Sequence, residues 1–190
     1  MGTFIHDPGD RQPPLASLDG KSKTSRVQQL VSILGLQPHP EGGWYREVFR
    51  SPATVSPRDG RTSRSALTSI YFLLDAGSRS RWHKVSSDEV WVHLEGAPLL
   101  LWTSSMTLRE APACTRLGPV DSEETRPQHT VPGGTWQAAQ PMVVHAGPEH
   151  VLTACMVGPG FDFSDFCLMT EDGNEAGLVR QHWPDLSRFI

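Results

Sequence analysis

The first regular hydrophobic pattern in the chain places four aliphatic side chains on one helical face. They are Val27, Leu30, Val31 and Leu34. This spacing predicts a short amphipathic helix over 26–34. Thr24 or Ser25 can cap its first turn, and Gly35 can end it. Residues 1–23 mix Pro, Gly, Asp, Ser and Lys without periodicity, which predicts a mobile tail ahead of one domain over 24–190.

After Gly35 the pattern changes to short runs rich in β-branched and aromatic residues, separated by clusters of Pro, Gly, Asp and Ser. The runs are 44–50, 65–74, 90–94, 98–103, 134–139, 151–157 and 161–169. Several short strands with turn signals between them are typical of an all-β sandwich or barrel. A second helical turn is expected around 178–186, where Pro184 stops it.

Composition narrows the class of protein. A length of 190 residues suits one domain, and a net charge of −4 argues against a dedicated nucleic-acid binder. No apolar run approaches the roughly 18 residues that a membrane span needs, and the N-terminus lacks the pattern of a secretory signal. The three cysteines, an odd number without CxxC spacing, fit reduced thiols. We therefore expect a cytoplasmic protein that binds neither nucleic acid nor membrane.

One segment, GSRSRWHKVSSDEVWVHLEG from Gly77 to Gly96, is much more specific than composition. It resembles the first cupin motif, G-x5-H-x-H-x3-4-E-x6-G. His83 and Glu89 stand at their positions, whereas Val85 replaces the second histidine. The later segment VPGGTWQAA resembles the second cupin motif, P-x-G-x2-H, with Gln137 in place of its histidine.

Five segments extend this resemblance along the chain in collinear order. They are 37–47, 69–74, 82–91, 131–139 and 157–166. Together they resemble one largely uncharacterised cupin subfamily, similar in fold to the deoxysugar-nucleotide 3,5-epimerases. The resemblance implies an all-β cupin jelly-roll barrel with a short N-terminal helix, a pocket in the barrel mouth and a homodimer.

The resemblance also raises the question of a metal. Metal-binding cupins hold Fe, Mn, Ni or Zn with three histidines and one glutamate. Here the corresponding ligands are His83, Glu89 and Gln137, because Val85 cannot ligate. His93 can partly restore the site, since it shares a strand face with Glu89 if that face points inward. The alternative is a degenerate cupin whose His83 and Glu89 hydrogen-bond each other or a ligand.

Without a metal, the same groups suit acid–base chemistry. His83 titrates near neutrality, and Glu89 beside it would fix its tautomer and raise its basicity. The epimerases of similar fold use a histidine base, an acidic partner and a tyrosine acid. Tyr71 and Tyr45 are the two tyrosines of this chain, so either can be the proton donor. We take Tyr71 as the catalytic candidate and Tyr45 as a pocket residue.

A local excess of arginine suggests what the pocket recognises. The stretch 46–84 is rich in arginine although the whole chain is acidic, and arginine suits carboxylate or phosphate groups. We expect Arg46 and Arg81 to bind an anionic small molecule, such as a nucleotide or sugar phosphate. The further pocket-lining candidates, chosen from the motif segments, are His39, Glu41, Trp91, His93, Trp136 and Gln137.

Three functions remain open at this point. The first is an isomerase, epimerase or lyase that acts on an anionic or nucleotide-linked metabolite, with His83 and Glu89 as its acid–base pair. The second is a metal-dependent enzyme of the oxygenase type with His83, Glu89 and Gln137 as ligands. The third is a cupin that binds a metabolite without catalysis.

Overall fold

The computed structural model describes residues 24–120, 124–142 and 147–190, so the tail expected at 1–23 lies outside the described residues. The predicted first helix is confirmed as α1 (Arg26–Leu34). Ser25 caps its first turn through a capping box, and Gly35 ends it in the left-handed conformation. At the other end of the chain, α2 (Asn174–His182) is followed by the 3-10 helix η2 (Pro184–Phe189).

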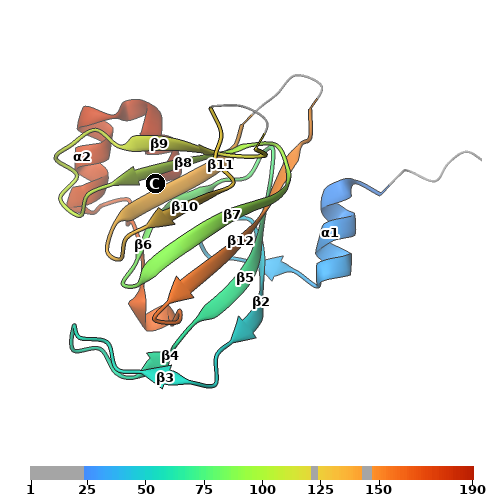
Figure 1. Cartoon of the computed structure of the whole chain (residues 1–190). Helices are drawn as coiled ribbons and strands as arrows, with labels where there is room; N and C mark the ends of the chain where they lie inside the picture. Colours follow the sequence, from blue (N-terminus) through green and yellow to red (C-terminus); the bar gives the residue numbers. More distant parts are fainter. Residues whose placement is uncertain (1–23, 121–123, 143–146) are drawn as a thin grey trace, which may run out of the picture.

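Two antiparallel sheets form the body of the molecule (Figure 1). In spatial order, the first consists of β1 (Gln37–Pro38), β2 (Trp44–Arg50), β5 (Thr68–Asp75), β12 (His150–Gly158), β7 (Asp88–Gly96) and β10 (Gln128–Val131). The second consists of β13 (Phe166–Leu168), β6 (Ser80–Val85), β11 (Trp136–Pro141), β8 (Leu99–Ser104) and β9 (Ala113–Leu117). A small separate hairpin is formed by β3 (Thr54–Val55) and β4 (Arg64–Ser65). This is the expected all-β cupin jelly roll.

Three hydrophobic clusters divide the fold into layers. Between the two sheets lies the main core, which includes Phe72, Trp91 and Leu101. The outer face of the second sheet packs against α2 and η2, where Trp82 contacts Phe189 with ring centroids 6.3 Å apart. The outer face of the first sheet packs against α1 through a smaller cluster. The space between the sheets is therefore the central layer of the described residues, with a smaller buried layer on either side of it.

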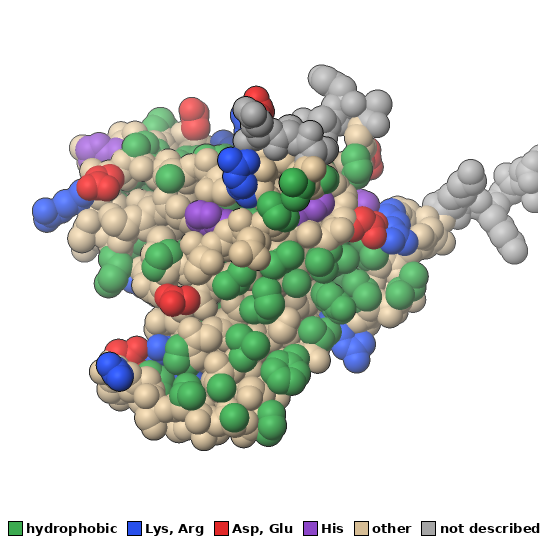
Figure 2. All heavy atoms as spheres, viewed as in Figure 1, with side chains coloured by type: hydrophobic (Ala, Val, Ile, Leu, Met, Phe, Trp, Pro, Cys, Tyr) green, Lys and Arg blue, Asp and Glu red, His purple; other side chains and the backbone are tan. Residues whose placement is uncertain are grey.

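Part of the outer face of the first sheet stays apolar without a covering helix. Val90 and Val92 of β7, and Ala154 and Met156 of β12, alternate with residues that face the interior. Figure 2 shows hydrophobic side chains gathered over these strands and the neighbouring β5 and β2. The homodimer expected from the resemblance stays a prediction. Within the described ranges, no helix combines the length and the apolar character needed to span a membrane.

The predicted strand over 161–169 is wrong in its first half. Residues Phe163–Asp165 form the 3-10 helix η1, and a strand begins only at Phe166. Asp162 caps η1 by accepting a hydrogen bond from the Ser164 N–H at 2.9 Å. Alternation of Phe and Asp indicates a strand, but an Asp that bonds its own backbone two residues on favours a turn instead.

A tight turn between β1 and β2 carries two of the predicted site residues, and it depends on glycine. Gly43 has φ +68°, and a Cβ there would lie 2.6 Å from both the Leu73 carbonyl oxygen and Leu74 Cδ2. Gly60 also has a positive φ, +85°, but a Cβ there would meet no atom within 4 Å. The first glycine is required for close packing as well as for conformation, and the second for conformation alone.

We therefore expect Gly43→Ala to destabilise the protein more than Gly60→Ala. The positive φ costs about 1 kcal/mol at each position, and overpacking against β5 adds roughly 1–3 kcal/mol at Gly43 alone. Urea unfolding of the two variants measures the difference. Equal losses in the free energy of unfolding would show that the turn can move away from β5.

Candidate functional site

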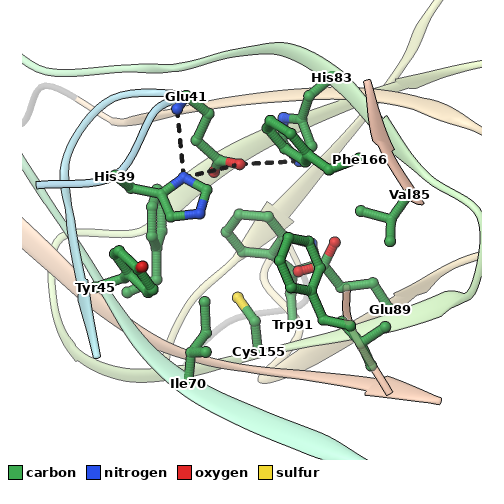
Figure 3. A pocket seen from close by; sticks show the side chains of 13 residues that line it. His39, Glu41, Tyr45, Ile70, His83, Val85, Glu89, Trp91, Cys155 and Phe166 are labelled. Carbon is green, nitrogen blue, oxygen red and sulfur yellow. Dashed lines mark hydrogen bonds and ion pairs between the residues drawn. The ribbon is translucent and has the colours of Figure 1, made fainter. Parts of the chain in front are cut away.

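A small, partly enclosed cavity lies between the sheets, at the end of the barrel where β6, β7 and the β1–β2 turn meet (Figure 3). Its polar lining consists of His39, Glu41, Tyr45, His83, Glu89 and Cys155, and its apolar lining of Ile70, Phe72, Val85, Trp91, Val157, Phe161 and Phe166. The centres of water molecules can occupy about 40 Å³ of this cavity, which is enough for a few waters. A metabolite would have to move part of the wall.

His83 comes from β6 and is only 2% exposed. Its Nδ1 lies 2.8 Å from the carbonyl oxygen of Arg81, and a carbonyl only accepts hydrogen bonds. Nδ1 therefore carries the hydrogen, and in the neutral ring Nε2 carries the lone pair. The tautomer of His83 is thus set by its own strand. The expectation that Glu89 fixes the tautomer of His83 is therefore wrong.

The partner of His83 is Glu41, which lies at the turn between β1 and β2 and is 5% exposed. Glu41 Oε2 lies 3.3 Å from His83 Nε2 and 3.4 Å from His39 Nδ1 (Figure 3). His39 Nδ1 accepts the backbone N–H of Glu41 at 3.3 Å, so its one lone pair already has a donor. Ser80 Oγ donates to the other oxygen, Oε1, at 2.9 Å. A hydrogen on Oε2 would bond to the lone pair of His83 Nε2, whereas a bare oxygen would face that lone pair with no hydrogen between them.

Burial favours the same protonation state. It raises the pKa of Glu41 to about 8, although the hydrogen bond from Ser80 opposes the shift. Burial lowers the pKa of His39 to about 4, and it also lowers the pKa of His83. Near pH 7 the arrangement is therefore a neutral carboxylic acid between two neutral imidazoles.

Glu89 is the second buried carboxyl of the cavity, on β7 and 7% exposed. Burial raises its pKa to about 7, whereas the nearby His83 and the hydrogen bonds from Gln137 and Cys155 lower it. Gln137 Nε2 donates to Glu89 Oε2 at 2.5 Å, and the Trp91 indole N–H donates to Gln137 Oε1 at 3.0 Å. Because an indole N–H only donates, this chain of bonds fixes which end of the amide faces Glu89.

The donor set does not fit the metal expected from the resemblance. The oxygen of Gln137 is already bonded to Trp91, and its amide nitrogen faces Glu89, so it offers no ligand atom. Val85 lines the cavity at the position of the missing histidine. Within the described ranges, no group of three or more His, Cys, Asp or Glu is arranged to hold a metal ion. We derive no chemical step through a metal.

Two predicted residues lie on the outer face of the first sheet. Tyr71 alternates with Ile70 and Phe72, which line the cavity, and packs in the cluster under α1. It therefore cannot donate a proton in this cavity, which corrects its predicted catalytic role. Arg46 Nη1 donates to the carbonyl oxygen of Leu34 at 3.0 Å, so it caps the C-terminal end of α1.

Three further candidates also lie away from the cavity. Arg81 lines a shallow outer groove with Arg79 and Arg188. Trp136 belongs to the cluster under α2, with Lys84 Nζ 4.6 Å from its ring centroid. His93 Nε2 lies 3.1 Å from the carbonyl oxygen of Ala97 at the far end of β7. The cavity thus assembles His39, Glu41, Tyr45, His83, Glu89 and Trp91 from the predicted set, with Gln137 directly behind it.

The site residues predicted from the sequence do not include the part of the wall that follows β12. Phe161 and Phe166 line the cavity from a segment that we call the aromatic strap, residues 161–166. Asp165 anchors the strap: its carboxylate accepts hydrogen bonds of 2.8–2.9 Å from Arg61 and Arg64. The strap also receives a hydrogen bond of 3.1 Å from Arg50 to the Phe161 carbonyl oxygen. The local arginine excess therefore partly serves to hold the cavity closed.

Comparison with known proteins agrees with this architecture. A family model described as "Cupin superfamily (DUF985)" matches residues 28–169. The uncharacterized protein YML079W of Saccharomyces cerevisiae is 27% identical over 167 residues, which cover 82% of this chain and 81% of that protein. The matched region spans every residue that lines the cavity.

Two solved structures are similar over nearly their whole length. A hypothetical protein from Leishmania major has 30% identity and a TM-score of 0.74, covering 88% of this chain and 97% of that one. Protein SO0799 from Shewanella oneidensis has 29% identity and a TM-score of 0.69, covering 84% and 91%. None of these descriptions names an activity, so the chemistry has to be read from the residues of this chain.

The protonated state of Glu41 determines how the free energy of unfolding should change with pH. The folded protein keeps a proton on Glu41 up to pH about 8, whereas the unfolded chain releases it near the ordinary value of 4.5. This contribution to stability is complete below that ordinary value and is lost as the pH rises to about 8. Glu41→Gln lacks the titration but keeps the acceptor for Ser80 and gains an N–H donor toward His83 Nε2.

Relative to the wild type, Glu41→Gln should therefore gain on the order of 3 kcal/mol between pH 5 and pH 8. Urea unfolding at several pH values measures this difference, and Glu47→Gln, on the protein surface, is the matched control. A difference that stays constant with pH would show that Glu41 is ionised in the folded protein.

The donor geometry also predicts the metal content. Protein purified without a histidine tag should contain well below one equivalent of Fe, Mn, Ni or Zn in elemental analysis. About one equivalent in the wild type, lost in His83→Gln, would instead support the metal-dependent alternative with His83, Glu89 and Gln137 as ligands.

Proposed function

This chain belongs to the cupin superfamily, in the family DUF985, and we propose that it is a small-molecule enzyme of the isomerase, epimerase or lyase type. The reaction is a proton transfer inside the barrel cavity. The observation that carries this proposal is the buried contact of 3.3 Å between Glu41 Oε2 and His83 Nε2, which joins an acid and a base as a neutral pair. Closed cavities exclude water, and this strengthens the electrostatic interactions inside them.

The neutral pair suits concerted acid–base catalysis on a carbonyl compound. Glu41 gives its Oε2 proton to the carbonyl oxygen of the substrate, and His83 Nε2 then takes a proton from the adjacent carbon. The substrate becomes an enol, Glu41 a carboxylate and His83 an imidazolium. Return of the proton to another carbon, or to the other face, completes an isomerisation or epimerisation. In an elimination, the enol returns its proton to Glu41 as the new double bond forms, and the imidazolium of His83 protonates the leaving group.

Three neighbours support the charged intermediate of the enzyme. The Arg81 carbonyl oxygen accepts the Nδ1 hydrogen of His83 and stabilises the imidazolium. Ser80 donates to the Glu41 carboxyl and stabilises the carboxylate. The charge of Glu89 favours protonated His83 as well, because it raises the pKa of that ring. Glu89 thus keeps a part in the acid–base group, although Glu41 is the direct partner of the histidine.

The expected proton donor also changes. Tyr45 lines the cavity, with its ring centroid 4.5 Å from that of His39, and it is a further candidate acid in place of Tyr71. An anionic or nucleotide-linked substrate, as expected from the arginine pattern, receives no support from this lining, because no Lys or Arg is among its residues. Such a group would have to stay outside the cavity.

Deuterium incorporation tests the proposal without knowing the substrate. A library of small carbonyl metabolites is incubated with the protein in D₂O and analysed by mass spectrometry. The wild type should introduce solvent deuterium into a member of the library. Glu41→Gln and His83→Gln should each reduce the rate by roughly 100-fold or more, the usual contribution of a positioned acid or base.

The surface variants Glu110→Gln and His182→Asn are the matched controls and should keep the full rate. Retention of the rate in both cavity variants would refute the acid–base assignment. Tight binding of a library member without exchange or turnover would favour the alternative of a cupin that binds a metabolite without catalysis.

A further inference from the structure

The cavity has an unusual balance of charged groups. Two carboxyls, Glu41 and Glu89, are buried in its wall, and no Lys or Arg side chain lines it. The two imidazoles, His39 and His83, do not compensate, since Glu41 already bonds to the nitrogens that face it. A buried carboxylate normally requires a cationic partner. Among the residues that the structure describes, the wall provides none.

Glu89 is the carboxyl whose bonding is incomplete. Gln137 Nε2 donates one hydrogen bond to it, and the Cys155 thiol, a weak donor, gives a second. An ionised carboxyl has about four acceptor positions. The remaining capacity faces the cavity, as Figure 3 shows for the orientation of the Glu89 side chain. Glu41 differs, because Ser80 and the two imidazoles already occupy its oxygens.

Four aromatic rings line the cavity that holds Glu89. Trp91 lies two residues along the same strand and contacts Phe72 edge to face, with centroids 5.7 Å apart. Phe161 and Phe166 of the aromatic strap, with centroids 6.0 Å apart, line the same cavity. The faces of aromatic rings carry partial negative charge and attract organic cations. The rings and the carboxyl therefore favour the same sign of charge.

From these observations we propose that the cavity selects a compact organic cation, whose charged nitrogen lies against Glu89 and the surrounding aromatic rings. This inference rests on the proposed function, because it takes the same cavity as the place where the substrate binds. It assigns Glu89 to substrate recognition and leaves the proton transfer to Glu41 and His83. A positive nitrogen near a carbonyl group also makes an adjacent carbon-bound proton more acidic, which suits that transfer.

Three probes of nearly identical planar shape test the sign of the charge. Acetamidinium is a cation, acetamide is neutral and acetate is an anion, and each has only four heavy atoms. Binding to the full-length protein is followed at pH 7.5 and constant ionic strength by NMR shifts of the tryptophan indole N–H groups. Acetamidinium should bind at least about tenfold more tightly than acetamide, as expected for a charge-assisted hydrogen bond, and acetate should bind most weakly.

Glu89→Gln should reduce the affinity for acetamidinium about tenfold and leave that for acetamide nearly unchanged. Glu110→Gln, at an exposed position away from the cavity, is the matched surface control and should change neither. Circular dichroism melting verifies that the variants are folded, and Glu89→Asp, which keeps the charge, should recover part of the preference for the cation.

Acetate binding as tightly as acetamidinium, equal affinity of the three probes, or no binding of any probe would each overturn the inference. So would a cation preference that survives in Glu89→Gln. Because the readout is binding, it is separate from the proposed reaction. Cation binding without deuterium incorporation would refute the proposed function alone, and incorporation into a neutral or anionic substrate without a cation preference would refute this inference alone.

Discussion

The contact between Glu41 and the two imidazoles is the constraint on which the site depends. A carboxyl with 5% exposure is stable only as a neutral acid or with a compensating charge. Here the lone pair of His83 Nε2 and one serine hydroxyl bind the neutral form. The backbone holds the same arrangement in place, because the Arg81 N–H donates to the Glu41 carbonyl oxygen at 2.9 Å. This hydrogen bond fixes the β1–β2 turn against β6. A change in either element would expose or ionise Glu41 and alter the chemistry of the cavity.

The second requirement is closure, and it comes from elements remote in sequence. The aromatic strap has little regular structure of its own, and its position depends on Asp165. That carboxylate pairs with Arg61 and Arg64 from the β3–β4 hairpin, and its side chain is only 5% exposed. These ion pairs are more buried than ordinary surface pairs and so contribute more to the position of the strap. Because the cavity wall buries its two carboxyls, their pKa values are raised. The same wall therefore encloses the cavity and raises the proton affinity of Glu41 and Glu89.

Local patterns predicted the fold well and the site only in part. Helical spacing located α1, motif spacing identified the cupin barrel, and alternation along β6 and β7 turned His83 and Glu89 inward. The same alternation explains why Tyr71 points away from the cavity, since Tyr71 follows the cavity-lining Ile70 by one residue on β5. The approach of Glu41 to His83 was not predictable, because a turn and a strand 42 positions apart meet only through the packing of the barrel. The ion pairs of Asp165 with Arg61 and Arg64 are nonlocal in the same way, because they join residues about 100 positions apart in the sequence.

The two positions where the chain departs from the metal-binding motifs explain the acid–base character of the site. A histidine at position 85 would place a polar ring in the wall, whereas Val85 makes this wall apolar and deepens the desolvation of both carboxyls. A histidine at position 137 would offer a lone pair to a metal, whereas Gln137 turns an N–H toward Glu89 and its oxygen toward Trp91. Both replacements remove ligands, and in the proposed function Glu41 then carries a proton while Glu89 binds the substrate. The same barrel geometry that brings ligands together around a metal in other cupins here brings together groups that share protons.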